Sequence, residues 1–317
     1  MESPSVKIAI ELNDAGLILV QGDAANPPSP GVAVWDGHDL FVGSDAWSRF
    51  RRLPRDANDR FWERLSQEPM DRPLGPARSS ADLVHSHLAE VWKSGGGGSG
   101  GVLFSVTGAF NDKQIALLLG IAQSVGIPVS GVVDTGLASA MAASAGFSAV
   151  VHVDTQLHRA VVTRVEVGEM LVRARAAMVN PFGLKPLTDL WLRFLAQAFV
   201  RTTRFDPLDR GEDEQQLFDQ LPACLAALQH ESSAPLELHV HDRVHAITVK
   251  RDELLQIAQA PYRQLLKEVE ALCNPGEPTL VQLSSRLCML PGFVSLVRRE
   301  ISAEVMELLP GAGPRSL

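Results

Sequence analysis

The sequence has few cysteines, less positive than negative charge, and no long apolar run. Its three cysteines, Cys224, Cys273 and Cys288, match no zinc or redox spacing, which indicates buried, inert thiols in a reducing compartment. Lysine and arginine total 29 against 37 acidic residues, so the net charge is -8. Because a surface of that sign repels phosphate backbones, the composition argues against nucleic acid as a partner.

No segment has the pattern of a membrane span or of a signal peptide. The apolar stretches fall short of the roughly 20 residues that cross a bilayer, and no positive stretch at residues 1–4 leads into an apolar run. We therefore expect a cytoplasmic protein without a membrane span. The chain has 317 residues, 45% of them hydrophobic, which is enough for a large core. At about 150 residues per domain, this length predicts two lobes.

Residues 1–145 predict a first lobe that begins with an antiparallel meander and continues as a β-α-β-α unit. A segment rich in arginine, aspartate and proline predicts a small inserted subdomain at about 46–93, with Ser80 as the cap of its second helix. A loop of glycine and serine, either natural or engineered, follows at 94–101. The predicted strands cover 6–12, 17–20, 32–35, 40–42, 102–106 and 129–133, and the helices 59–66, 80–93, 111–126 and 137–145.

Residues 146–309 repeat this pattern and predict a second lobe, with an inserted subdomain at about 205–275 and a tail at 310–317. Two copies of a meander followed by alternating helices and strands form an internal pseudo-repeat. The consequence is two similar lobes with a cleft between them, where ligands commonly bind. The predicted strands cover 149–153, 160–166, 170–177, 236–241, 244–249 and 280–283, and the helices 187–203, 217–228, 252–273 and 292–301.

Four strings resemble segments of a known family and occur in the same order. Residues 106–114, V-T-G-A-F-N-D-K-Q, are similar to V-P-A-Y-F-N-D-x-Q, and residues 126–129, G-I-P-V, fit the G-L-x-V that follows. Residues 178–189 resemble the stretch around H-L-G-G-E-D-F-D, and residues 283–293 are similar to G-G-S-S-R-I-P with a short insertion. These strings belong to the nucleotide-binding domain of the seventy-kilodalton heat-shock chaperones, in the actin-like ATPase superfamily. The resemblance covers about residues 6–309.

The resemblance implies an α/β fold with two actin-like, ribonuclease H-like lobes. Each lobe would be a mixed five-stranded sheet with helices and an inserted subdomain. It also implies a site for ATP and Mg²⁺ between the lobes, built from glycine-rich hairpins and carboxylates. Because the sequence ends at Leu317, we do not expect the family's peptide-binding β-domain, nor the function of a standard ATP-driven peptide chaperone.

The two phosphate hairpins of the family have changed. The first, D-L-G-T-T, keeps a carboxylate as Glu11, but Asn13 replaces its glycine and Asp14 stands where a hydroxyl is expected. A carboxylate beside polyphosphate adds repulsion. The second, D-L-G-G-G-T, keeps Asp154, but Gln156 is the first of three larger residues in place of the glycines. We expect these side chains to occupy the space that a phosphate needs.

Three further positions have changed as well. In N-E-P-T-A-A-A, which carries the water-activating carboxylate, the glutamate is Thr135, and Asp134 lies one residue away. The catalytic lysine of I-K-R-L corresponds to Glu63, a reversal of charge. In the adenosine segment two glycines are replaced and three residues are kept, which gives Gln282, Leu283, Ser284, Ser285 and Arg286.

Changes in all five places predict that the chain does not hydrolyse ATP efficiently, because losing one electrostatic contributor costs orders of magnitude in rate. We therefore expect no cofactor, with residual ATP and Mg²⁺ binding as the alternative. The leading hypothesis is a non-catalytic scaffold or regulatory subunit that binds protein partners in a bacterial-type cytoplasm, with a dimer left open. The rivals are an ATPase or sugar kinase that uses Asp154, Glu11 and Asp134 unconventionally, and an actin-like subunit that assembles.

Other groups leave two interpretations open. The histidines His239, His241 and His245 could form either a metal site or an exposed polar face. We prefer the polar face and therefore expect no metal. An anion-binding patch or a solvated face fits the arginines Arg49, Arg51, Arg52 and Arg55. A subdomain core or a partner surface fits the aromatic residues Trp47, Phe50, Phe61 and Trp62. Glu11 and Asp154 either retain a cation between the lobes or have a structural role.

Overall fold

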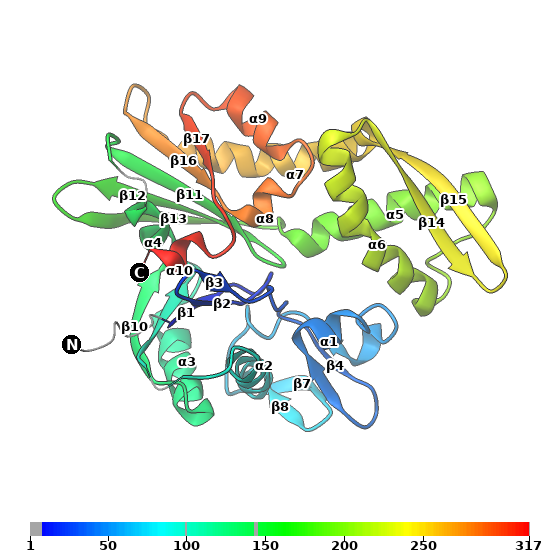
Figure 1. Ribbon diagram of the computed structural model, residues 1–317, viewed down its shortest axis with the longest axis horizontal. Coiled ribbons are helices and arrows are strands. Elements are labelled where there is room, and N and C mark those ends of the chain that lie inside the picture. Colours follow the sequence, from blue (N-terminus) through cyan, green and yellow to red (C-terminus); the bar gives the residue numbers. More distant parts are fainter. Residues whose placement is uncertain (1–7, 99, 143–144, 317) are drawn as a thin grey trace.

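The computed structural model describes residues 8–98, 100–142 and 145–316, and these residues form a mixed α/β structure. It contains two mixed sheets of five strands, each accompanied by helices (Figure 1). The expected α/β class and the two five-stranded sheets are therefore confirmed. We call the part around the first sheet the first lobe and the part around the second sheet the second lobe.

The two sheets have the same topology. In the first sheet the order is β3-β2-β1-β9-β10, and in the second it is β13-β12-β11-β16-β17. Each has two antiparallel pairings on one side of its central strand and two parallel pairings on the other. The repeat seen in the sequence is thus present in the strand order. The strands are β1 (Ile8–Leu12), β2 (Ile18–Gln21), β3 (Ala24–Ala25), β9 (Val102–Val106), β10 (Val129–Asp134), β11 (Ala149–Thr155), β12 (Ala160–Val167), β13 (Leu171–Val179), β16 (Thr279–Leu283) and β17 (Glu304–Glu307).

The inserted part of the first lobe differs from the prediction in three details. The strands expected at 32–35 and 40–42 pair with each other, and the first of them also pairs with β6, in a small sheet of order β5-β4-β6 that is separate from the meander. Residues 61–64 form a turn where a helix was expected. Ser79, one residue before the expected cap, accepts the capping hydrogen bond of α2. The elements here are β4 (Ala33–Trp35), β5 (Leu40–Val42), α1 (Gly43–Trp47), the short 3-10 turn Pro54–Asp56, β6 (Ala57–Asn58), β7 (Pro69–Leu74), β8 (Ala77–Ser79), α2 (Ser80–Ser94) and α3 (Asp112–Val125).

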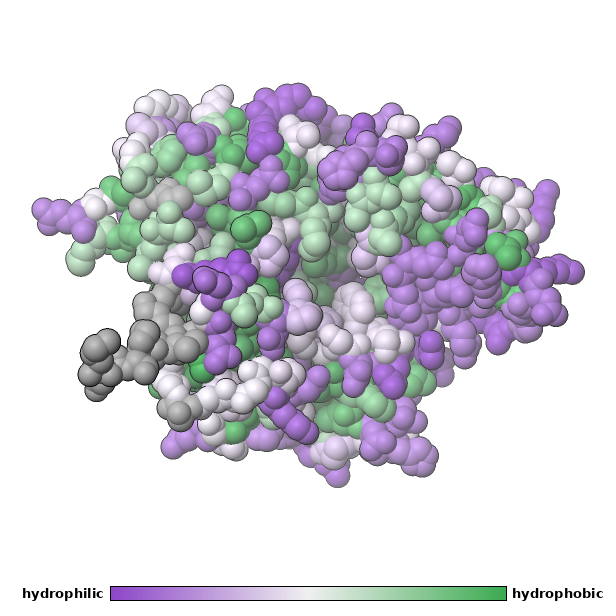
Figure 2. Space-filling model, viewed as in Figure 1, coloured by the Kyte–Doolittle hydropathy of each residue, from purple (hydrophilic) through white to green (hydrophobic). Residues whose placement is uncertain are grey.

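One hydrophobic core runs from the second sheet into the block at 205–275. Val151 on β11, Leu228 on α6 and Ala234 on β14 belong to the same cluster of buried residues. Hydrophilic side chains gather over the outer end of this block, where α6, β14 and β15 lie (Figure 2). The elements are α5 (Leu184–Thr203), α6 (Gly211–His230), β14 (Ser233–Val240), β15 (Arg243–Lys250), α7 (Arg251–Ala271), α8 (Ser285–Cys288) and α9 (Phe293–Glu300).

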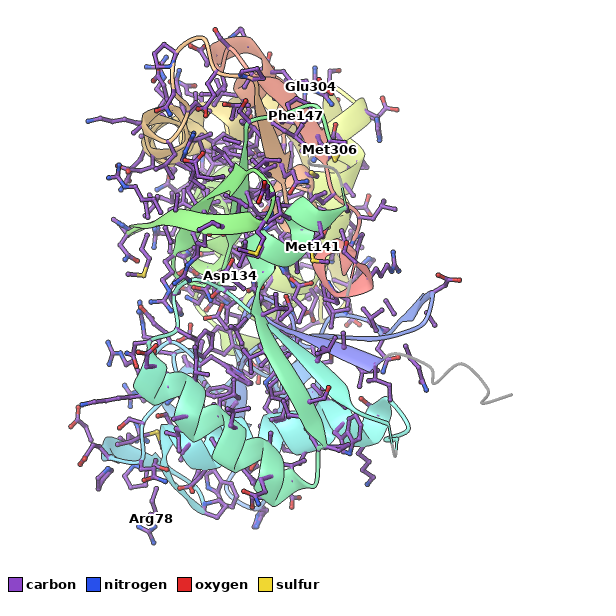
Figure 3. The ribbon with its side chains drawn as sticks, turned by 90° about the vertical axis from the view of Figure 1, so that its left-hand side faces the viewer. Arg78, Asp134, Met141, Phe147, Glu304 and Met306 are labelled. Atoms are coloured by element: carbon purple, nitrogen blue, oxygen red, sulfur yellow. The ribbon has the colours of Figure 1, made fainter. Side chains whose placement is uncertain are left out.

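Two short helices cross from one lobe to the other. Helix α4 (Thr135–Met141) follows β10 but packs mainly on β11, β12 and β13 of the second sheet. Figure 3 shows Asp134, where α4 begins, at the boundary between the lobes. Helix α10 (Ala312–Arg315) follows the second sheet but packs on α4, β1 and β9. The segment expected to be a tail therefore contains buried residues and joins the two lobes. None of the helices within the described ranges is long and apolar enough to cross a membrane.

Candidate functional site between the two lobes

The two hairpins that correspond to the phosphate loops of the resembled family touch each other directly. The side-chain amide of Asn13 donates to Asp154 Oδ2 at 2.8 Å and to the carbonyl of Thr155 at 3.1 Å. In return, Asp14 Oδ1 accepts a hydrogen bond of 2.8 Å from the backbone N–H of Leu157. Burial raises the pKa of Asp14 to about 6, although the Leu157 hydrogen bond opposes the rise. The space between the hairpins is thus bridged by three hydrogen bonds.

Arg286 is the cation of this site. Its guanidinium donates to Glu11 Oε1 at 2.6 Å and to the carbonyl of Gly16 at 2.7 Å, and it lies 3.6 Å from Asp154 Oδ2. All three side chains are buried. Burial raises the pKa of Glu11, and the charge of Arg286 opposes that rise. Arg286 of the second lobe therefore contacts both carboxylates that the sequence analysis selected, Glu11 of the first lobe and Asp154 of its own lobe.

The side chains that replace the second hairpin's glycines all point into protein contacts. Gln156 donates to Thr107 Oγ1 at 3.2 Å and accepts from Arg159 Nε at 2.6 Å. Leu157 is fully buried, in one cluster with four apolar residues of the first lobe, namely Val32, Val34, Ala46 and Phe50. His158 Nε2 lies 3.2 Å from a carboxylate oxygen of Asp59. The second lobe thereby inserts this turn into the first lobe.

The carboxylate nearest the expected water-activating position, that of Asp134, is also engaged in hydrogen bonds and an ion pair within the protein. Asp134 Oδ1 caps α4 by accepting from the N–H groups of Gly136 and Leu137 at 2.8 and 3.2 Å. Its Oδ2 forms an ion pair of 3.0 Å with Arg173 of the second lobe. Thr135 is buried, with its hydroxyl 2.9 Å from that of Ser105. The side-chain oxygens of both residues therefore already have partners within the protein.

The remaining predicted residues divide into two groups. Gln282 donates to the carbonyl of Ser139 at 3.2 Å, and Ser284, Ser285 and Arg286 line the centre of the site. Leu283 instead belongs to the apolar core of the second lobe. Glu63 forms an ion pair of 2.7 Å with Arg60, and its charge contributes to the raised pKa of Asp14. Glu63 thus pairs with a neighbouring arginine, at a position where the resembled family has a lysine.

A cavity of only about 20 Å³ remains at the centre. Small-molecule pockets usually measure about 300–1,000 Å³, whereas a single water needs roughly 10–15 Å³ by such a measure. The cavity is lined by strand ends of both lobes and by the segment before and within α10, that is by Glu11, Thr135, Ser139, His152, Asp154, Ser284, Ser285, Arg286, Leu308, Leu309, Gly311, Ala312 and Gly313. The site as folded is therefore large enough for one water and too small for a nucleotide.

His152 is a cavity residue that the sequence analysis missed. Both of its ring nitrogens and Ser284 Oγ are buried without a protein partner, as is Oε1 of the neighbouring Gln282. Burial lowers the pKa of His152, so its ring is neutral. A signal was present in the sequence, because His152 stands two residues before Asp154 on a strand and side chains two apart share a face. One water in the cavity would satisfy at most one ring nitrogen of His152 together with Ser284 Oγ.

A second set of contacts closes the cleft near the inserted subdomains. The ring of Trp47 lies 4.7 Å from that of Phe218 on α6, and Phe50 packs beside both. Arg51 pairs with Asp189 at 2.7 Å and with Glu214 at 3.1 Å. Trp47 and Phe50, which were expected to form a subdomain core or a partner surface, therefore pack against the second lobe of the same chain.

The other open interpretations have simple outcomes. Phe61 and Trp62 are buried in the first-lobe core, where Trp62 Nε1 donates to His87 Nδ1 at 3.0 Å. His245 stacks on Phe205 at 4.3 Å. Among the described residues, no group of three or more His, Cys, Asp or Glu side chains is arranged to hold a metal ion.

A larger crevice of about 700 Å³ lies elsewhere between the lobes. Its lining includes three prolines and the pair Lys185–Asp189, and its side chains come from the first-lobe segment 59–60 and from α5 and α7. His158 of the second hairpin also lines it, whereas Glu11, Asp134 and Asp154 do not. Neither models of protein families nor curated protein sequences match this chain.

Proposed function

We propose that the chain is a two-lobed member of the actin-like ATPase superfamily, similar to the nucleotide-binding domain of the seventy-kilodalton heat-shock chaperones, that has lost ATP chemistry. In this proposal it acts in the cytoplasm as a protein-binding scaffold or regulatory subunit. If the strands of each sheet are numbered from 1 to 5 in chain order, both sheets have the order 3-2-1-4-5. This repeated order supports the fold assignment. The order of the family-like strings along the chain supports it as well.

One observation carries the proposal: the protein's own side chains fill the place between the hairpins. Asn13, Asp14 and Arg286 make direct contacts between the lobes there, and about 20 Å³ is left empty. A nucleotide would have to break these contacts and separate the lobes before it could enter. Part of the free-energy cost of this opening is the loss of the buried ion pairs between Arg286 and the two carboxylates.

Each carboxylate that phosphoryl transfer would need is committed to another partner. Mg²⁺ is held by carboxylate oxygens and phosphates, and the attacking water is oriented by a free acceptor. Here Arg286 takes the place of a metal ion beside Glu11 and Asp154. Asp134 is committed to the start of α4 and to Arg173. The chemistry of the donor set therefore favours a structural role for all three acids.

A closed cleft is useful in a scaffold because it holds the surfaces of both lobes in one arrangement. Binding then requires less ordering, and affinity comes from contacts already in place. An ATPase of this architecture gains its activity from a cleft that opens and closes. In this chain the contacts at Arg51 and Phe218 add to those at Arg286, so two separate regions hold the lobes together.

Isothermal titration calorimetry with Mg-ATP, together with a phosphate-release assay, tests the proposal. We expect no saturable heat and no release of phosphate above the level of buffer. A matched variant, Leu157→Gly with Arg286→Ser, removes two of the side chains that close the space. If this variant gains nucleotide binding, the side chains and not a loss of the fold exclude the ligand. Saturable binding with turnover in the natural sequence would sink the proposal.

A further inference from the structure

Helix α3 has more apolar surface than the fold uses. Its sequence reads Ile-Ala-Leu-Leu-Leu-Gly-Ile-Ala from residue 115 to 122, and a helix that is apolar on all sides is normally buried on all sides. Only Leu118, Ile121 and Ala122 are buried, while Leu119 is 38% exposed. The outward face of α3 therefore combines exposed apolar residues, Ala116, Leu119 and Gly120, with polar ones such as Lys113 and Gln123.

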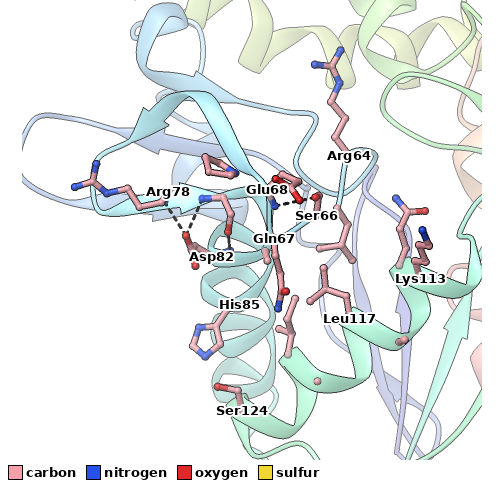
Figure 4. A pocket seen from close by; sticks show the side chains of 18 of the residues that line it. Arg64, Ser66, Gln67, Glu68, Arg78, Asp82, His85, Lys113, Leu117 and Ser124 are labelled. Atoms are coloured by element: carbon pink, nitrogen blue, oxygen red, sulfur yellow. Dashed lines mark hydrogen bonds between the residues drawn. The ribbon is translucent and has the colours of Figure 1, made fainter.

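A groove runs along this face between α3 and α2, bounded by the loop at residues 64–69 (Figure 4). Its volume is about 1330 Å³, and its apolar lining includes Leu65, Ala81 and Leu117. Ala116, Gly120 and Ser124 follow one another at intervals of one turn on the α3 side. These small residues leave room for a close neighbour, and a Cβ atom added at Gly120 would meet no atom within 4 Å.

Three cations and two acids line the groove. Arg64, Arg78 and Lys113 line it, and none of their side chains forms an ion pair with a described residue. Of the two acids present, Asp82 accepts from the backbone N–H groups of Arg78 and Ser79 at the start of α2. The lining, with Glu68 and Asp82 as its acids, thus has one more positive than negative charge, in a chain whose net charge is -8.

We infer that this groove binds an amphipathic helix with acidic flanks, presented by a partner protein. The inference rests on the proposed scaffold function and names its docking site. Apolar side chains at helical spacing on the partner would lie along Leu117 and over Ala116 and Gly120, as in other helix-in-groove complexes. Acidic side chains on either flank would meet the three free cations, which fixes the direction and register of the partner.

A labelled synthetic peptide tests the inference by fluorescence anisotropy. The probe is a helix of about five turns, with leucines on one face and glutamates on both flanks, and a matched control peptide has lysines in place of the glutamates. We expect saturable binding of the glutamate peptide that weakens as salt is added, and no binding of the lysine peptide. Equal binding of both peptides, or of neither, contradicts the inference.

Two variants at Gly120 locate the peptide. Gly120→Trp fills the groove with a side chain that the fold leaves room for, and about a tenfold or greater loss of affinity is expected. Gly120→Ala keeps the groove open and binding unchanged. Charge reversal with Lys113→Glu is expected to cost about tenfold as well. Peptide binding that survives Gly120→Trp overturns the inference.

Two outcomes would assign the groove to a different occupant and overturn the inference in the same way. One is a dimer in sedimentation that Gly120→Trp disperses, which makes a second copy of this chain the occupant. The other is tighter binding of single-stranded RNA than of the peptide. Calorimetry with Mg-ATP on the same preparations separates this inference from the proposed function. Nucleotide binding counts against the closed cleft alone, whereas loss of the peptide alone counts against the groove.

Discussion

Arg286 lies between two buried carboxylates, at 2.6 Å from Glu11 and 3.6 Å from Asp154. Methionine is similar in length to arginine but has no charge, so this substitution would leave both acids without their cation. Removing one partner of a buried ion pair typically costs about 3–5 kcal/mol. We therefore predict that Arg286→Met lowers the unfolding free energy by about that amount, measured by urea denaturation.

The exposed pair Arg298–Glu307 provides the matched control. Its atoms are 2.8 Å apart, and the two side chains are 55% and 44% exposed. Water screens such a pair, so Arg298→Met should change stability by less than about 1 kcal/mol. Equal losses in the two variants would show that Arg286 has no special role in holding the lobes together.

His87 predicts a dependence of stability on pH. It is fully buried, accepts from Trp62 Nε1 at 3.0 Å and lies 2.9 Å from Ser29 Oγ, and burial lowers its pKa to about 3. An unfolded histidine has a pKa of about 6.5, so the unfolded chain binds the proton first as pH falls. The stabilisation from a neutral His87 is present above that pH and is progressively lost towards pH 3.

From about pH 7.5 to about pH 5 the loss attributable to His87 is about 2 kcal/mol. His87→Gln keeps a donor and an acceptor but does not titrate. We therefore expect the unfolding free energy to decrease less steeply with falling pH in the variant than in the natural protein. Near pH 5 the two slopes should differ by close to one bound proton. Parallel curves for the two proteins would mean that His87 is charged, or accessible to water, in the folded state.

At the residue scale the sequence analysis identified carboxylates but not their partners. Glu11 and Asp154 could be selected because a family pattern marks them. The partner of Glu11, Arg286, stands 275 positions away, and it was assigned to a relict adenosine segment. Pairing across that separation depends on how the two lobes dock, which no local pattern encodes. The contact of Asp14 with the N–H of Leu157 was not predictable for the same reason.

Among the secondary structure elements, α4 packs closely on the second sheet. A Cβ atom at Gly136 would lie 2.9 Å from the side chain of Thr163 on β12. Gly136→Ala therefore forces α4 away from the sheet, and such overpacking costs about 1–3 kcal/mol. Gly120→Ala on α3 introduces the same methyl group into open space and is expected to stabilise its helix by up to about 1 kcal/mol. Thermal unfolding of both variants should show shifts of opposite sign, and equal shifts would contradict this packing.

Elements with a strong period were predictable, and those that depend on a neighbour were not. The buried strands β1 and β9 and the long helices α5 and α7 have apolar residues at regular strand or helix spacing and appear close to their predicted bounds. The short edge strand β17 and the crossing helix α10 were missed, since each has about four residues and exists through contacts with other elements. The turn at 61–64 was predicted as helix because its apolar residues have helical spacing, which their burial in the first-lobe core also explains.

At the scale of the whole molecule, the closed cleft joins all of these features. The hairpins meet at Asn13 and Asp154, the inserted subdomains meet at Trp47 and Phe218, and α10 crosses between the sheets. The hairpin contacts and α10 surround the same small cavity, and the inserted subdomains meet at a second place. A ligand that opens it must therefore act against all of them, which explains why we expect Mg-ATP to leave the lobes unmoved.

The distance between the lobes tests this claim most directly. Spin labels at Gln123→Cys on α3 and Lys267→Cys on α7 are on exposed positions of the two lobes, with Cys273→Ser and Cys288→Ser to avoid unwanted labelling. Double electron–electron resonance should give one narrow distance distribution that is the same with and without Mg-ATP. A second population, or a shift of the distance on adding nucleotide, would contradict the account of a closed cleft held by the protein's own side chains.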